Sequence, residues 1–153
     1  MILTEKETLT LKDLQNQEKI CMEHYTLCAN TAKDSGLKDL FSQIAKDEQE
    51  HYQSLSKVLN GEIPSFSTVV TKADDYHPTA VYDETSNPVD KAHDALLCAD
   101  SIGNEKLVST DYNVNIFQFG PGEVRKLLNH IQTEEQQHAE MIYKYKEANC
   151  MTN

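Results

Sequence analysis

Four long stretches of the chain carry apolar residues at alternating spacings of three and four, the period of an amphipathic helix. The breaks between them contain residues that commonly begin and end helices. The pattern predicts helices from just after Thr4 to about Lys33, from Ser35 as N-cap to Leu59, from Asn87–Pro88 to near Gly120, and from there to about Ala148. Residues 61–87 lack this period, hold or adjoin three of the four prolines and contain scattered Ser, Thr and Asp, so we expect an irregular connection there.

Each predicted helix has one apolar stripe, and packing the four helices in a left-handed bundle would bury all four stripes. The predicted fold class is therefore all-α, as a single domain over residues 1–153. It would consist of a helical hairpin at about 5–60, a crossover at about 61–87 and a second hairpin at about 88–149. Such a crossover reaches up to about 90 Å when extended, whereas a helix of about 25 residues spans about 38 Å. The crossover can therefore return along the whole bundle.

A glutamate interrupts every apolar stripe, and a tyrosine or histidine follows each glutamate at a fixed distance. The first and third helices carry Glu-x6-Tyr, and the second and fourth carry Glu-x-x-His. One offset of 87 residues takes Glu18 to Glu105, Tyr25 to Tyr112, Glu48 to Glu135 and His51 to His138. The chain is thus interpreted as an internal repeat of two hairpins.

Four glutamates in a bundle core require accompanying positive charge, because buried unpaired carboxylates are costly and neighbouring ones repel each other. Two divalent cations would cancel the four charges. One Glu from each of two helices, with Glu-x-x-His from each of the other two, is the ligand set of dinuclear carboxylate bundles. We therefore predict two metal ions held by Glu18, Glu48, His51, Glu105, Glu135 and His138. Tyr25 and Tyr112 are expected to hydrogen-bond a ligand carboxylate of the opposite hairpin.

The remaining reactive residues have simpler interpretations. The cysteine spacings fit neither a zinc knuckle nor a CxxC pair, so we expect reduced thiols that act as small buried hydrophobic residues. We expect the other histidines to lie on the surface, four further glutamates to lie on a solvated face, and two crossover tyrosines to attach the crossover to the bundle. These residues are Cys21, Cys28, Cys98 and Cys150; His24, His77, His93 and His130; Glu23, Glu50, Glu134 and Glu140; and Tyr76 and Tyr82.

The formal net charge of −11 changes the range of expected partners. It argues against nucleic acid or an anionic membrane surface as the main partner, and it suits a protein that attracts cations. Residues 1–20 are charged from position 5 onward and lack an apolar core, so we expect no signal peptide and a cytoplasmic location. No run of about 18 apolar residues predicts a membrane-spanning helix.

The two Glu-x6-Tyr and Glu-x-x-His halves resemble the rubrerythrins and, more broadly, the ferritin-like superfamily. That resemblance implies a ferritin-like four-helix bundle with a di-iron centre that reduces peroxide or oxygen, or oxidises ferrous iron. Rubrerythrins typically carry an additional iron–thiolate module with paired CxxC motifs. This sequence has no such motif, so electrons would have to come from a separate donor protein.

The whole length also resembles the Coat F family of clostridial and bacillar spore coat proteins. The resemblance rests on stretches that precede the two Glu-x-x-His motifs, residues 37–41 before Glu48-Gln49-Glu50-His51 and residues 128–131 before Glu135-Gln136-Gln137-His138. It implies a structural component of the spore coat.

Two functions remain open at this point, a redox-active enzyme with two metal ions and a structural coat protein with a stabilising or relic metal site. An enzyme needs an open coordination position and a path to solvent, whereas a structural centre can be closed. Glutamate and histidine ligands suit iron, manganese or zinc, and the rubrerythrin resemblance favours iron. A homodimer through one face of the bundle, or assembly into a coat, is the default expectation for quaternary structure.

Overall fold

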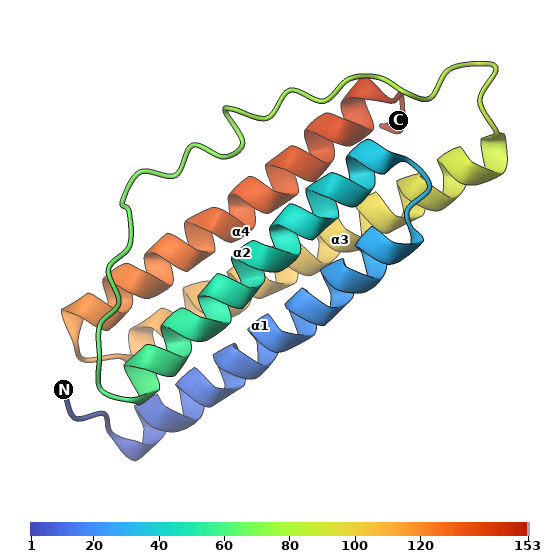
Figure 1. Cartoon of the computed structure of the whole chain (residues 1–153). Helices are drawn as coiled ribbons and strands as arrows, with labels where there is room; N and C mark the ends of the chain where they lie inside the picture. Colours follow the sequence, from blue (N-terminus) through green and yellow to red (C-terminus); the bar gives the residue numbers. More distant parts are fainter. Residues whose placement is uncertain (153) are drawn as a thin grey trace.

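The computed structural model describes residues 1–152, and within that range the chain forms helices and no strands. Four long helices lie side by side: α1 (Glu5–Thr31), α2 (Ser35–Leu59), α3 (Pro88–Asn115) and α4 (Gly122–Ala148) (Figure 1). A short 3-10 helix, η1 (Ile116–Gln118), follows α3. Because α1 packs mainly on α2 and α3 mainly on α4, the predicted all-α bundle of two hairpins is confirmed.

The first and third helices begin at the caps that the sequence predicts. The Thr4 hydroxyl accepts a hydrogen bond from the backbone N–H of Glu7 at 3.2 Å, and the Glu7 carboxylate accepts one from the Thr4 N–H at 2.8 Å. This reciprocal pair satisfies two backbone donors that the helix itself leaves free. The Asn87 side chain caps α3, with Pro88 in the first turn.

The predicted N-cap of α2 is wrong by one residue. Asp34 rather than Ser35 caps this helix, because its carboxylate accepts a hydrogen bond from the N–H of Leu37 at 2.9 Å. An aspartate also interacts favourably with the positive end of the helix dipole. At the other end, α2 stops where Gly61 adopts a φ of 87°, a left-handed conformation that glycine reaches without steric cost.

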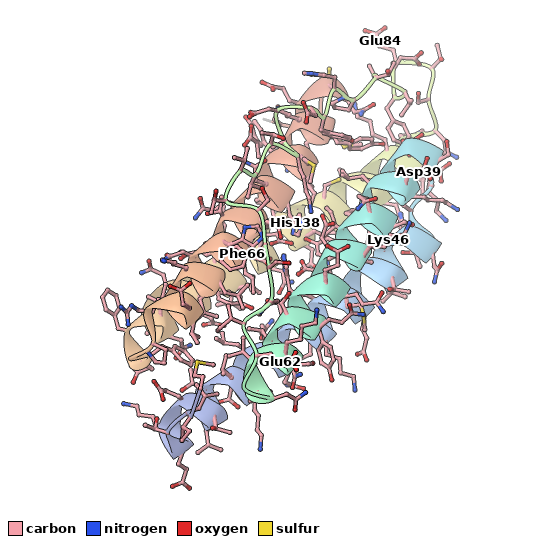
Figure 2. The ribbon with its side chains drawn as sticks, turned by 60° about the vertical axis from the view of Figure 1, so that its left-hand side comes forward. Asp39, Lys46, Glu62, Phe66, Glu84 and His138 are labelled. Atoms are coloured by element: carbon pink, nitrogen blue, oxygen red, sulfur yellow. The ribbon has the colours of Figure 1, made fainter. Side chains whose placement is uncertain are left out.

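The crossover between α2 and α3 has no helix or strand and runs along the length of the bundle (Figure 1). α1 and α4 point in one direction and α2 and α3 in the other, so the crossover returns the chain to the end where α2 began. Glu62 and Glu84 mark its two ends in Figure 2. Tyr82 donates a hydrogen bond to Asp94 at 2.6 Å and Tyr76 packs against the core, so both tyrosines attach the crossover as predicted.

Two apolar clusters fill the bundle, one toward each end. The first joins the start of α1, the end of α2, the end of α3 and the start of α4, with Leu11, Leu55 and Leu128 among its members. The second joins the opposite ends of the same helices, with Phe41 and Ile142 among its members. Polar side chains at the middle of all four helices lie between the clusters, so apolar packing fixes the helices above and below this polar level.

Candidate metal centre

The six residues predicted as ligands meet at the polar level, halfway along the bundle. Glu18 of α1, Glu105 of α3, the Glu48–His51 pair of α2 and the Glu135–His138 pair of α4 are all buried. Each lies near the middle of its helix, so the antiparallel packing of the helices brings them to the same height. The structure therefore brings together every residue of the predicted set, and their role as metal ligands stays a prediction.

One group of potential ligand atoms surrounds Nδ1 of His51. This nitrogen lies 3.0 Å from Oε1 of Glu135, 3.2 Å from Oε2 of Glu48 and 3.4 Å from Oε2 of Glu18. These four residues can each offer one atom such that all lie within 4.8 Å of one another. Three carboxylates and one imidazole at this spacing suit a divalent transition-metal ion.

A second group surrounds Nδ1 of His138. This nitrogen lies 3.4 Å from Oε1 of Glu48, 3.5 Å from Oε1 of Glu105 and 3.9 Å from Oε2 of Glu135. These four residues also offer atoms within 4.8 Å of one another. Glu48 and Glu135 belong to both groups, and each directs one oxygen toward His51 and the other toward His138. Two adjacent positions thus share two carboxylates that can bridge them.

The unsatisfied atoms of the cluster test whether metal ions fit it. Among the described residues, seven buried side-chain atoms lack a hydrogen-bond partner, and six of them belong to the predicted ligands. They are Oε2 of Glu18, Oε1 of Glu48, Oε2 of Glu105, both carboxylate oxygens of Glu135 and Nδ1 of His138. Buried polar atoms without partners are rare because each costs free energy. Coordination of metal ions would satisfy these atoms, so the residues fit the predicted centre.

Burial and neighbouring charges strongly shift the pKa values of the cluster. Burial, followed by the charge of Glu135, raises the pKa of Glu18 well above its usual range and that of Glu105 to about 8. Surrounding carboxylates raise the pKa values of His51 and His138, although burial opposes this. Burial also opposes the ionisation of Glu48 and Glu135, but their hydrogen bonds lower the pKa values of both, so the shifts within the cluster run in both directions.

Two further carboxylates orient the histidines from outside the cluster. Oε2 of Glu134 lies 2.6 Å from Nε2 of His51, and Oδ2 of Asp47 lies 3.1 Å from Nε2 of His138. Each carboxylate comes from the hairpin opposite to its histidine. An acceptor at Nε2 favours the tautomer whose Nδ1 has a free lone pair, and Nδ1 is the atom that faces the cluster. Lys72 of the crossover pairs with both carboxylates, at 2.9 Å from Asp47 and 3.0 Å from Glu134.

The two predicted tyrosines contact Glu18 and Glu105, the two cluster glutamates that belong to one group each. Tyr25 donates a hydrogen bond to Glu105, and Tyr112 donates one to Glu18. Both bonds connect opposite hairpins, as expected. Burial, followed by the charge of the glutamate that it contacts, raises the pKa of each phenol, so both stay protonated and remain donors.

A cavity of about 400 Å³ lies beside the centre, between the crossover, α2 and α4. His51, Glu134 and His130 line its inner side, and Phe66 and Lys72 of the crossover line its outer side. Phe66 stacks on His130 with ring centroids 5.0 Å apart, and Nε2 of His130 lies 3.4 Å from Glu134. The cavity therefore reaches the outer face of the group of potential ligand atoms around His51, although none of the four cluster glutamates lines it.

Three predictions about the surrounding residues are wrong. Glu134 was expected on a solvated face, but it is buried against His51, because its long side chain reaches across to α2. His130 was expected to be an ordinary surface residue, but it is half-buried between Phe66 and Glu134. Cys150 is exposed, because it follows the end of α4, whereas the other three cysteines are buried as expected.

Other predictions about the surface hold. Glu23, Glu50 and Glu140 are exposed on the outer faces of their helices, and His77 is exposed on the crossover. His24 and His93 are exceptions like His130, because both are half-buried, where His24 contacts Ser101 and His93 contacts Asp94.

Asp47 and Lys72 were not predicted to lie beside the metal centre. The sequence repeat could have indicated Asp47, because it precedes Glu48 as Glu134 precedes Glu135, at the same offset of 87 residues. No sequence pattern indicated Lys72, because the crossover has no hydrophobic period from which the direction of a side chain can be inferred.

Comparison with known proteins gives one partial family match. Residues 93–149 match a family model described as the Coat F domain. This range begins within α3 and ends one residue beyond α4, so it includes Glu105, Glu135 and His138 but less than half of the chain. No curated protein and no solved structure matches the chain. The Coat F resemblance is thus supported for the second hairpin, and the ferritin-like and rubrerythrin resemblances stay predictions. Over residues 1–152 no helix is sufficiently long and apolar to cross a membrane.

Proposed function

We propose that this chain is a spore coat protein of the Coat F type whose bundle binds two divalent metal ions, and that the ions stabilise the bundle. One observation carries the metal proposal: Glu48 and Glu135 each direct one carboxylate oxygen toward His51 and the other toward His138. Glu18 and His51 would complete one position, and Glu105 and His138 the other. The Coat F match to the second hairpin supports the coat role.

A stabilising role follows from the electrostatics of the cluster. Four buried carboxylates from four helices repel one another, and this repulsion opposes the close approach of the two hairpins. Two divalent ions would replace that repulsion with bonds that join all four helices. Ligand binding to the folded state alone raises its stability in proportion to the logarithm of ligand concentration over the dissociation constant.

Metal content and metal titration test the proposal. The wild-type protein is expected to bind about two zinc or iron ions per chain, measured by elemental analysis and by calorimetric titration. The Glu48→Ala, Glu135→Ala double variant should bind none, because both positions lose their shared ligands. The Glu50→Ala, Glu140→Ala double variant is the matched control, since it removes two exposed glutamates from the same helices. Absence of metal from the wild type, or equal binding by the first variant, would contradict the proposal.

A second candidate function is redox activity toward peroxide, oxygen or ferrous iron, with iron at both positions. The cavity beside His51 favours it, because a small oxidant could approach the centre there. Bound iron would supply the electrons for reduction of the oxidant, and a separate electron-donor protein would replace them. The Glu134 carboxylate and the imidazole of His130 would line the approach of the oxidant to the centre.

Two measurements separate the candidates. Iron-loaded protein with a chemical reductant should consume hydrogen peroxide catalytically if the centre is a redox enzyme, and the Glu48→Ala, Glu135→Ala variant should not. A coat protein should instead appear during sporulation, resist extraction from spores, and be stabilised equally by redox-inert zinc. Stabilisation by zinc without peroxide turnover by the iron form would favour the structural role.

A further inference from the structure

Lys72 is a crossover residue whose single ammonium group joins the two carboxylates that hold the histidines. Its Nζ lies 2.9 Å from Oδ1 of Asp47 on α2 and 3.0 Å from Oε1 of Glu134 on α4. The other oxygens of these carboxylates contact His138 and His51, respectively. A continuous chain of contacts thus runs from one imidazole through Lys72 to the other.

The backbone beside Lys72 is fixed to α4 through both polar backbone groups of one residue, Ala73. The N–H of Ala73 donates to Oε1 of Gln137 at 2.7 Å, and the carbonyl of Ala73 accepts from the ammonium of Lys144. Ala73 is itself fully buried in the apolar cluster around Phe41. An otherwise irregular segment is therefore held in place next to Lys72. Because the backbone is already ordered there, only the entropy of the side chain is lost when Lys72 takes up its position.

These contacts differ from those of an ordinary surface ion pair. Exposed pairs contribute little, because water screens them and both side chains must be ordered. Here the side chain of Asp47 is 2% exposed and that of Glu134 is 12% exposed. Removal of Lys72 would leave two mutually close carboxylates with less positive charge, and buried carboxylates without partners are costly. Gln43 also donates to Asp47, at 3.2 Å, but carries no charge.

We propose that Lys72 is a positioning residue for both halves of the metal centre, because one ammonium fixes the two carboxylates that orient His51 and His138. This inference rests on the proposed metal-binding function. Each carboxylate, held at one oxygen by Lys72, accepts the Nε2–H of a histidine at the other and so directs Nδ1 toward the ligand cluster. Outer contacts of this kind change metal affinity by about 10–100-fold when they are removed.

Zinc binding by Lys72→Met, measured by competition with a chelating dye, tests the inference. Met keeps most of the unbranched side chain and removes its ammonium group. We expect zinc affinity to fall by about 10–100-fold at both positions, and Lys72→Arg to restore much of it, because a guanidinium can also join two carboxylates. Lys126→Met is the matched control, since Lys126 pairs with the exposed Glu123 and its loss should leave zinc affinity unchanged.

Nitrogen-15 spectra of the histidine rings provide a readout that general destabilisation would not mimic. In the zinc-loaded protein, the Nε2–H signals of both His51 and His138 should shift in Lys72→Met. Asp47→Asn should shift mainly the His138 signal, and Glu134→Gln mainly the His51 signal, because each carboxylate contacts one imidazole. These two variants also test the chain of contacts should Lys72→Met fail to fold.

The outcomes distinguish this inference from the proposed function. Normal zinc affinity and unshifted imidazole signals in Lys72→Met would overturn the positioning role while leaving the metal centre intact. A shift at one histidine alone would also overturn it, since the inference requires both. Absence of zinc binding by the wild type would overturn the proposed function and the role of Lys72 together.

Discussion

Tyr112 donates a hydrogen bond to Oε1 of Glu18, although 94 residues separate the two in the sequence. Tyr25 makes the equivalent bond to Glu105 across 80 residues. The two bonds join α1 to α3, helices that belong to different hairpins and pack less extensively on each other than on their hairpin partners. They also leave Oε2 of Glu18 directed toward His51, at 3.4 Å.

The Tyr112→Phe variant should be less stable than the wild type. It removes a buried hydrogen bond and leaves Oε1 of Glu18 without this partner, which should lower the free energy of unfolding by about 1–3 kcal/mol. Urea denaturation of the metal-free protein measures the change. Tyr143→Phe is the matched control, because Tyr143 is 49% exposed and its loss of a hydroxyl should change stability little. Equal midpoints for the two variants would show that the buried bond does not stabilise the fold.

Zinc should raise the melting temperature of the wild-type protein. At a free concentration about 100 times the dissociation constant, one ion adds about 2.7 kcal/mol to the free energy of unfolding. For a chain of this size that corresponds to a rise of about 5–10 °C, measured by calorimetry and reversed by a chelator. The Glu48→Ala, Glu135→Ala variant should show no rise. An equal rise in that variant would place the stabilising ions elsewhere.

Asp94 should make stability depend on pH in the acidic range. Burial opposes its ionisation, but hydrogen bonds from Tyr82 and from the backbone amides of Lys33 and Asp34 lower its pKa below 3.8. Because the folded-state pKa is depressed, the stabilisation is complete above the unfolded-state pKa and is lost as pH falls through the folded-state value.

The Asp94→Asn variant should therefore lose about 1–3 kcal/mol at pH 7, and the difference from the wild type should shrink below about pH 4. Urea denaturation at several pH values measures it. Asp13→Asn, at an exposed position of α1, is the control. A difference that stays constant from pH 7 to pH 3 would exclude ionised Asp94 as its cause.

The four thiols should differ in their reactivity. Cys150 is exposed, whereas Cys21, Cys28 and Cys98 are buried, and burial raises the pKa of each of these three. Since the thiolate is the reactive form, a thiol reagent should label one cysteine per chain in the folded protein and four in denaturant. Loss of the fast reaction in Cys150→Ser would identify the site. Rapid labelling of a second thiol in the folded state would indicate that the bundle opens readily.

The fold was predictable because each helix carries its own apolar period and its own end signals. Thr4 with Glu7 and Asn87 with Pro88 show this, since each pair needs only local sequence to form its cap. The six clustered residues were also predictable, because charged side chains on an apolar stripe must share a counter-charge. Asp34 replaced Ser35 as a cap because neighbouring residues compete for that position and a difference of one residue depends on local backbone geometry.

The contacts around the centre were less predictable because they depend on side-chain reach. Glu134 lies one residue before Glu135, on a different face of the helix by spacing, yet its flexible side chain extends to His51 on another helix. The position of Lys72 depends on how an irregular segment packs, and that packing is decided by distant residues such as Gln137 and Lys144.

The chain contains one crossover, whereas the helical hairpin occurs twice. Asp47 and Glu134 correspond under the 87-residue offset, so Lys72 lies near the two-fold axis that would relate two identical hairpins. Gln43 and His130 also correspond, yet one is an amide beside Asp47 and the other an imidazole beside Glu134. A dimer of identical hairpins would have two equivalent metal positions. In this chain the single crossover and the unlike pair Gln43 and His130 remove that equivalence, so the two proposed metal positions would differ in affinity.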